Sequence, residues 1–364
     1  MAQVCAAMTR LNHTVTLVAP DVVSPIKKDP REFYGLQEGF EVVRLPVFDA
    51  LRCRWIPGFL AFAFTMRSYG KALRTWLSAH QSDLLYTRSP RLIKSLLFTG
   101  IPVIVELHTL PRRSRSFVAC CNHCRMVVCL TQPMCDALIG WGVEPAQIIV
   151  EGDGVDPRRF ESMPVTEEAK RLWRVPSDRP VIGYVGSLVT RGTIEKGVSE
   201  LLQAFALLKR RGTKVFGWLI GGPRERIVFY HAKAVSLGLG NEDIRFEGPI
   251  HSPRIPSVLA ACDVCVYPAP ASQHRYFQRD TSPLKVFEYL AAGKPTVCAD
   301  IPPLKGVVDS ELVHLCVSGD VESLADAIAE ALAHPKANTE RRKALIEHVS
   351  WDARMQRILT FAHF

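Results

Sequence analysis

The chain has 364 residues, of which 48% are hydrophobic and 22% are charged. This length favours two domains, and the composition is that of an ordinary globular protein. The net charge of +9 is modest and no recognised nucleic-acid-binding motif accompanies it, so a nucleic-acid partner is not expected. No apolar run approaches the roughly 18 residues of a membrane-spanning helix.

Predicted strands and helices alternate along the whole chain. In the first half, strands are predicted at residues 13–20, 39–47, 82–90, 101–108 and 124–131, with a helix at 133–142. In the second half, strands at 180–188, 214–222, 244–250, 295–299 and 313–317 alternate with helices at 197–212, 284–292 and 320–335. This alternation predicts parallel sheets with crossover helices.

Two such series indicate an α/β protein with two Rossmann-like, doubly wound domains that face a cleft. We expect a first domain at residues 1–165 and a second at 181–345. Residues 166–180 are polar and broken by proline, so they are interpreted as a linker. A last helix at 346–364 is expected to cross back to the first domain.

One basic stretch near the start of the chain also carries aromatic residues. Residues 50–82 contain no acidic residue. They hold Arg52, Arg54, Arg67, Lys71 and Arg74 around Trp55, Phe59, Phe62 and Phe64. This combination suits contact with an anionic membrane surface. The alternative is an acceptor-side loop and helix whose apolar face belongs to the core.

The eleven cysteines lack the spacing of a disulfide framework, which favours a reducing compartment. The first residues lack the basic and apolar regions of a signal peptide. We therefore expect a cytoplasmic protein, peripheral at the inner face of the membrane if the basic stretch binds there. Cys121 and Cys124 have zinc-site spacing, and Cys129 and Cys135 lie nearby. Since Cys129 falls in a predicted buried strand, buried thiols are the favoured interpretation.

Several polar and glycine residues follow predicted strands of the second half. Ligands bind at the carboxyl ends of strands in an open parallel sheet. Gly186 and Ser187 follow one such strand, Gly222 follows the next, and Lys196 lies near the same end. Glycine turns, a lysine and a helix N-terminus on one edge predict a diphosphate site.

Two carboxylates flank the start of the predicted helix at 284–292. Asp280 precedes it. Glu288 lies within it, about 6 Å along the axis from the helix start. A carboxylate accepts two hydroxyl hydrogen bonds, which suits a ribose diol or a sugar. The alternative is that both acids are helix-dipole charges or surface salt bridges.

From about Val181 to its end, the chain closely resembles the donor-binding domain of the retaining glycosyltransferases of family 4 (group 1), which have the GT-B fold. Residues 185–208 resemble the family's glycine turn and Lys-Gly helix start, and residues 220–227 resemble its Gly-x-Gly-Pro turn. Residues 280–288 resemble its E-x7-E element. The first half matches more loosely, through "ELHTLP" with His108 and the Gly-Val-Asp turn at 154–156.

The resemblance implies a nucleoside-diphosphate sugar as donor and a lipid-linked or saccharide acceptor, with roles for several residues. Lys196 would neutralise the diphosphate, and Glu288 would hold the ribose hydroxyls. Asp280 and the turn of Ser282, Pro283 and Leu284 would hold the transferred sugar, which His108 would reach from the first domain. No D-x-D motif is present, so no metal is expected.

Three departures from the family pattern leave alternatives open. The first acid is Asp280 rather than Glu, and Ser187 stands where the family often has arginine, for which Arg191 is a candidate replacement. The chain also begins within the family's first helix, so we expect the natural protein to have roughly 20 further residues that supply an apolar strand and a glycine-rich loop. A non-catalytic nucleotide-sugar-binding relative and a GT-B sugar epimerase are the alternative functions.

Overall fold

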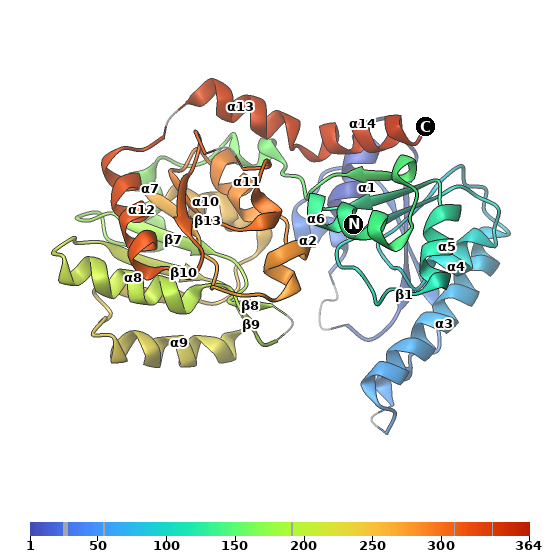
Figure 1. Ribbon diagram of the computed structural model, residues 1–364, viewed down its shortest axis with the longest axis horizontal. Coiled ribbons are helices and arrows are strands. Elements are labelled where there is room, and N and C mark those ends of the chain that lie inside the picture. Colours follow the sequence, from blue (N-terminus) through green and yellow to red (C-terminus); the bar gives the residue numbers. More distant parts are fainter. Residues whose placement is uncertain (25–27, 54, 191, 309, 337) are drawn as a thin grey trace. The chain divides into compact units, whose positions relative to one another are not determined.

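The computed structural model describes the whole chain except residues 25–27, 54, 191, 309 and 337 (Figure 1). It divides into two compact units. Unit 1 comprises Met1–Gly152 and Trp351–Phe364, and unit 2 comprises Asp153–Ser350. This division differs from the boundaries expected from the sequence. Residues 153–165 fall in unit 2, and part of the expected linker forms a helix of unit 2, α7 (Thr166–Trp173).

The described residues of unit 1 form two separate parallel sheets. The first pairs β1 (Thr16–Asp21) with β2 (Glu41–Pro46). The second has the order β3-β4-β5-β6 and consists of β3 (Leu85–Thr87), β4 (Val103–Leu107), β5 (Met126–Cys129) and β6 (Ile148–Val150). β4 and β5 are buried along their whole length, as the apolar runs of the sequence predict.

Seven α-helices of unit 1 are described. They are α1 (Ala2–Arg10), α2 (Pro30–Tyr34), α3 (Gly58–Leu77), α4 (Ile93–Leu97), α5 (Arg115–His123), α6 (Gln132–Trp141) and α14 (Trp351–Phe361). All but α2 contribute buried apolar residues. α1 and α14 contact each other, with Val4 and Met355 buried in one cluster. Cys121, Cys124, Cys129 and Cys135 are buried thiols, the arrangement favoured from the sequence. Burial raises the pKa of Cys121 and of Cys124 to about 12.

Unit 2 is built on one six-stranded parallel sheet with the order β11-β10-β7-β12-β13-β14. The strands are β7 (Val181–Val185), β10 (Phe216–Ile220), β11 (Ile244–Glu247), β12 (Val264–Tyr267), β13 (Thr296–Asp300) and β14 (His314–Val317). The chain leaves β7 toward β10 and β11, and then returns to β12 on the other side of β7. The strand order therefore reverses between β7 and β12, which is where ligands bind in such sheets.

Helices cover the sheet of unit 2, whose central strands are fully buried. Besides α7 they are α8 (Val198–Arg210), α9 (Arg224–Ser236), α10 (Ile255–Ala260), α11 (Leu284–Ala291), α12 (Val321–Ala333) and α13 (Thr339–His348). A hairpin of β8 (Val189–Thr190) and β9 (Ile194–Glu195) precedes α8. α8 and α12 pack side by side on the sheet (Figure 1). Among the described residues, no helix combines the length and apolar character that crossing a bilayer requires.

A buried ionic network links β4 to α14 within unit 1. The carboxylate of Glu106 is fully buried and lies 3.3 Å from the guanidinium of Arg354, which is 1% exposed. Arg88 lies 2.9 Å and His108 2.5 Å from the same carboxylate, and Tyr86 donates a hydrogen bond to it. Burial alone would raise the pKa of Glu106, but Arg354, His108 and Arg88 lower it below its ordinary value.

We expect Arg354→Met to lower the free energy of unfolding by about 3–5 kcal/mol, because it leaves Glu106 buried without its partner on α14. Arg357→Met is the matched control. Arg357 lies on the same helix and pairs with Glu151, but its side chain is 32% exposed, so its loss should cost about 1 kcal/mol or less. Urea unfolding followed by tryptophan fluorescence measures both. Equal losses would contradict a special role for the buried network.

Candidate functional site

The candidate site of unit 2 lies at the carboxyl edge of its sheet, where β7 and β12 diverge. Two glycine turns meet there. The N–H of Gly186 donates to the carbonyl of Ile220 at 2.8 Å, and that of Leu188 donates to the carbonyl of Gly222 at 2.7 Å. A Cβ added to Gly221 would lie 1.7 Å from the carbonyl oxygen of Gly186. Only glycine permits this approach.

Lys196 reaches the same edge from the turn that starts α8. Gly197 follows it with φ +77°, and a Cβ there would lie 2.7 Å from the backbone nitrogen of Ala269, in the loop after β12. The turn is therefore held against the end of β12. The ammonium of Lys196 lies 5.0 Å from the ring centroid of Tyr276. Burial lowers the pKa of Lys196 to about 8.

A second lysine, Lys285, joins the site and was not predicted from the sequence. It is the second residue of α11, and its side chain lies against Gly186, where an added Cβ would come within 1.7 Å of its Cε. Burial lowers the pKa of Lys285 to about 8, and the charge of Lys196 contributes in the same direction. Within the described part of the chain, neither lysine forms an ion pair with a carboxylate. The sequence signal was a lysine one position into a helix that follows a strand end.

Glu288 follows Lys285 by three positions, so both lie on one face of α11. Its carboxylate pairs at 3.3 Å with Arg159, which lies in a short helix at Pro157–Phe160. Arg159 also donates to the carbonyl of Ser252 at 2.7 Å. Burial raises the pKa of Glu288, while Arg159 and Lys285 oppose this shift. Glu288 thus belongs to a partly buried ion pair, in which both side chains are 18% exposed. Arg159 is a further residue that sequence reasoning missed.

Asp280 ends a short helical turn, Tyr276–Asp280, and is 4% exposed. Its Oδ1 accepts a hydrogen bond from Nε of Arg279 at 2.7 Å. Its Oδ2 is buried and has no hydrogen-bond partner in the described structure. A buried carboxylate oxygen without a donor is costly, so this atom is suited to accept a hydrogen bond from a bound molecule.

The turn after Asp280 leads directly into α11. Ser282 Oγ accepts a hydrogen bond from the backbone N–H of Asp153 at 2.8 Å. Pro283 occupies the N-cap position of α11 and Leu284 is its first residue. No side chain of the described residues caps this helix, so its first N–H groups are suited to bind a polar ligand.

The remaining predicted residues lie in different settings. The hydroxyl of Ser187 donates to the carbonyl of Val189 and so serves its own turn. Arg191 lies outside the described residues. His108 follows β4 and belongs to unit 1, where its Nε2 lies 2.5 Å from the Glu106 carboxylate. The structure therefore brings together Gly186, Gly222, Lys196, Asp280 and Glu288 in unit 2, and describes His108 in unit 1.

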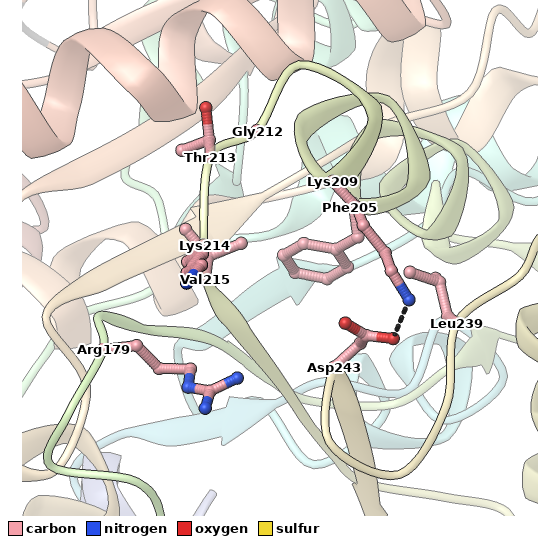
Figure 2. Close-up of a pocket in the computed structure, with 9 residues that line it drawn as sticks. All are labelled: Arg179, Phe205, Lys209, Gly212, Thr213, Lys214, Val215, Leu239 and Asp243. Carbon is pink, nitrogen blue, oxygen red and sulfur yellow. Dashed lines mark hydrogen bonds and ion pairs between the residues drawn. The ribbon is translucent and has the colours of Figure 1, made fainter.

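A hollow of about 300 Å³ lies elsewhere on unit 2 and does not include these residues (Figure 2). Its lining includes Arg179, which precedes β7, and Lys214 and Val215, which precede β10. It thus lies at the amino end of the strands, away from the candidate site. Lys209 spans part of it through an ion pair with Asp243 at 2.6 Å.

Comparisons with known proteins agree with the fold. The profile described as "Glycosyl transferases group 1" matches residues 179–334, and that described as "Glycosyltransferase Family 4" matches residues 1–159. The chain belongs to the family 4 (group 1) glycosyltransferases. The resemblance inferred from the sequence is therefore confirmed at the level of the family.

Two relatives of this family 4 chain have assigned activities. A D-inositol 3-phosphate glycosyltransferase of Corynebacterium urealyticum is 28% identical over 61% of this chain and 51% of its own length. A 2-deoxystreptamine N-acetyl-D-glucosaminyltransferase of Streptomyces fradiae is 30% identical over 53% of this chain and 44% of its own. The chain spans about half the length of these relatives.

Solved structures establish the GT-B fold of this family 4 chain. Sucrose-phosphate synthase from Thermosynechococcus elongatus superimposes with a TM-score of 0.74 at 19% identity, over 99% of this chain and 91% of its own. Anabaena Alr3699/HepE, in complex with UDP and glucose, gives a TM-score of 0.70 at 19% identity, over 99% of this chain and 95% of its own. The predicted fold class, two Rossmann-like domains with parallel sheets, is confirmed.

The two lysines generate a prediction about pH. Both ammonium groups lose their protons as the pH rises through about 8, so the affinity for inorganic pyrophosphate should fall between roughly pH 7 and pH 9. Lys196→Met and Lys285→Met should each weaken binding at pH 7 and flatten this dependence. Calorimetric titration at several pH values measures the affinity for pyrophosphate. Lys209→Met, which alters an exposed paired lysine, is the control and should leave this affinity and its pH dependence unchanged. Affinity that is independent of pH in the wild type would contradict the assignment.

Proposed function

We propose that this chain transfers a sugar from a nucleoside-diphosphate sugar to a hydroxyl acceptor, with retention and without a metal. One observation carries the proposal. In the described structure, two lysines without a carboxylate partner and a carboxylate oxygen without a donor lie on the edge of the sheet where the strand order reverses. Cations of this kind suit the diphosphate, and the free oxygen suits a sugar hydroxyl. Family membership supports the same function.

The proposed mechanism assigns each residue a separate task. The acceptor oxygen bonds to the anomeric carbon as the bond from that carbon to the diphosphate breaks, and the acceptor proton leaves with the diphosphate. Lys196, Lys285 and the N-terminus of α11 stabilise the negative charge that develops on the leaving group. Because these fixed cations supply the positive charge that the leaving group needs, the proposed mechanism requires no metal ion.

The carboxylates and the serine turn orient the donor. Glu288 is assigned to the ribose hydroxyls and Asp280, through Oδ2, to a hydroxyl of the transferred sugar. The diphosphate is assigned to the backbone of Gly186, Ser187 and Gly222. The turn of Ser282 to Leu284 presents the amides of α11. The assignment of His108 to the sugar rests on the resemblance to the family.

The donor and acceptor are narrower proposals. Anabaena Alr3699/HepE is described with UDP and with UDP-glucose, so we propose a UDP-hexose as donor. The two relatives are named for different acceptors, an inositol phosphate and a deoxystreptamine. We keep a lipid-linked or saccharide hydroxyl as the acceptor class, as in the assembly of polysaccharides.

A second candidate function is binding of a nucleotide sugar without transfer. Ser187 favours it, because its short side chain is turned into its own loop where the family often has an arginine. The two functions differ in their products, since only transfer or hydrolysis releases free nucleotide from the donor.

The test is release of nucleotide from UDP-glucose, UDP-galactose and UDP-N-acetylglucosamine in the presence of a lipid and saccharide extract. We expect release that persists in EDTA and falls by more than about 100-fold in Lys196→Met and Asp280→Asn, because each removes stabilisation of the transition state. Lys209→Met should retain full activity. Tight nucleotide binding without release would favour the second candidate, and activity lost in EDTA and restored by Mg²⁺ would contradict the role of the lysines.

The pair of Arg159 and Glu288 generates a separate prediction. Arg159→Met should weaken UDP binding by about 10-fold or more, as for a lost charged hydrogen bond. Without Arg159 the pKa of Glu288 should rise further, so the defect should be largest near pH 5.5 and should shrink as the carboxyl group ionises toward pH 7.5.

The neighbouring arginine supplies the control. Arg158 pairs with Asp156 at 2.9 Å and is 42% exposed, so Arg158→Met should bind UDP like the wild type. Arg159→Lys should restore part of the affinity. A defect of Arg159→Met that is the same at every pH would show that Arg159 supports the fold and not the charge of Glu288.

A further inference from the structure

Helix α3 of unit 1 and the turn before it expose an unusual set of large apolar side chains. Trp55 is 83% exposed and Phe59 is 72% exposed, and Leu60, Phe62 and Phe64 are also exposed. We call these five residues the α3 tip. Figure 1 shows the N-terminal end of α3 projecting beyond the other helices and the sheets of unit 1. The α3 tip is thus accessible and apolar, which in a soluble domain marks an interaction site.

The opposite face of α3 is anchored in unit 1. Thr65, Tyr69, Leu73 and Leu77 recur every four residues and are buried. The hydroxyl of Tyr69 donates to the carbonyl of Val18 in β1 at 2.8 Å. The exposure of the α3 tip is therefore not a sign of a loosely packed helix, because the same helix has a complete buried face of its own.

The exposed face of α3 changes from apolar to cationic along its length. Leu60, Phe64, Arg67, Lys71 and Arg74 are spaced by four, three, four and three residues and are all exposed. This spacing places them in one stripe along the helix. The apolar end is the end that projects, and the three cations follow it over the next turns.

The segment of sequence that contains this stripe is strongly basic. Between residues 50 and 135 the acids are Asp83 and Glu106, and Glu106 is fully buried. The same range holds twelve basic residues: Arg52, Arg54, Arg67, Lys71, Arg74, Arg88, Arg91, Lys94, Arg112, Arg113, Arg115 and Arg125. The guanidinium of Arg91 lies 5.2 Å from the ring centroid of Phe62, so this charge borders the α3 tip directly.

We propose that the α3 tip and the stripe of Arg67, Lys71 and Arg74 bind the surface of an anionic lipid bilayer. The aromatic side chains enter the interface between headgroups and acyl chains, and the cations contact the lipid phosphates. Amphipathic helices with aromatic residues and basic flanks bind membranes in this way. The inference goes beyond sugar transfer and does not depend on it, since binding to lipid requires no donor.

Charge favours lipid over a second copy of this chain. A symmetric dimer through α3 would set the three cations of one copy against either the cations or the apolar side chains of the other, with no exposed acid from residues 50 to 82 to compensate. A bilayer that contains phosphatidylglycerol supplies both an apolar interior and negative charge. It therefore satisfies both ends of the stripe at once.

The experiment is flotation of the purified chain with vesicles of phosphatidylcholine alone or with about one third phosphatidylglycerol. We expect binding to the anionic vesicles, weak binding to the neutral ones, and loss of binding in high salt. Trp55→Ser with Phe59→Ser should lower the bound fraction at least about 10-fold. The triple change of Arg67, Lys71 and Arg74 to Gln should do the same.

Matched changes on unit 2 control for general loss of hydrophobicity or charge. The first control, Val228→Ser with Phe229→Ser, removes exposed apolar side chains of α9. The second control changes three exposed cations, Arg210, Lys214 and Lys305, to Gln. Both should bind vesicles like the wild type, and thermal unfolding should show every variant folded. The proposal is overturned if the wild type fails to bind anionic vesicles, if the α3 changes leave binding intact, or if they instead abolish a dimer seen by sedimentation.

Discussion

The contact between the glycine turns after β7 and β10 is the constraint on which the rest of the candidate site depends. A side chain on Gly221 would overlap the carbonyl oxygen of Gly186, and one on Gly186 would overlap the side chain of Lys285. The absence of both side chains leaves the space that Lys285 occupies at the strand ends. A third glycine, Gly197, places Lys196 against the end of β12 by the same principle. Backbone proximity thus determines where the charges gather.

The charges brought together in this way are unfavourable without a ligand. Lys196 and Lys285 are both partly desolvated, and the charge of one disfavours the charge of the other. Asp280 adds a buried oxygen without a donor. A fold would ordinarily avoid such features, and where they occur on one edge they indicate a functional site. An anion that carries hydroxyl groups would compensate both the lysine charges and the carboxylate oxygen, which is why we propose a sugar diphosphate and not a simple anion.

The elements of unit 2 could be predicted from sequence because each is encoded locally. The β-branched runs that become β7, β12 and β13 are bounded by glycine or proline, and α8 shows its apolar face at helical spacing. Lys285 and Arg159 were missed because their partners are distant in sequence: Lys285 lies against Gly186, and Arg159 pairs with Glu288, 129 positions away. Pattern and spacing carry no information about such pairs, which arise only when the sheet brings strand ends together.

The sequence left two interpretations of residues 50–82, a membrane-contacting surface and a core-forming helix, and α3 shows that they need not compete. A helix has room for a buried stripe and an exposed stripe. The buried stripe through Tyr69 and Leu73 fixes α3 to unit 1. Because the helix is already ordered, its exposed stripe through Phe64 and Arg67 would contact a bilayer without the entropy cost of folding on it. The packing that seemed to argue against an interaction surface is therefore what would make that surface effective.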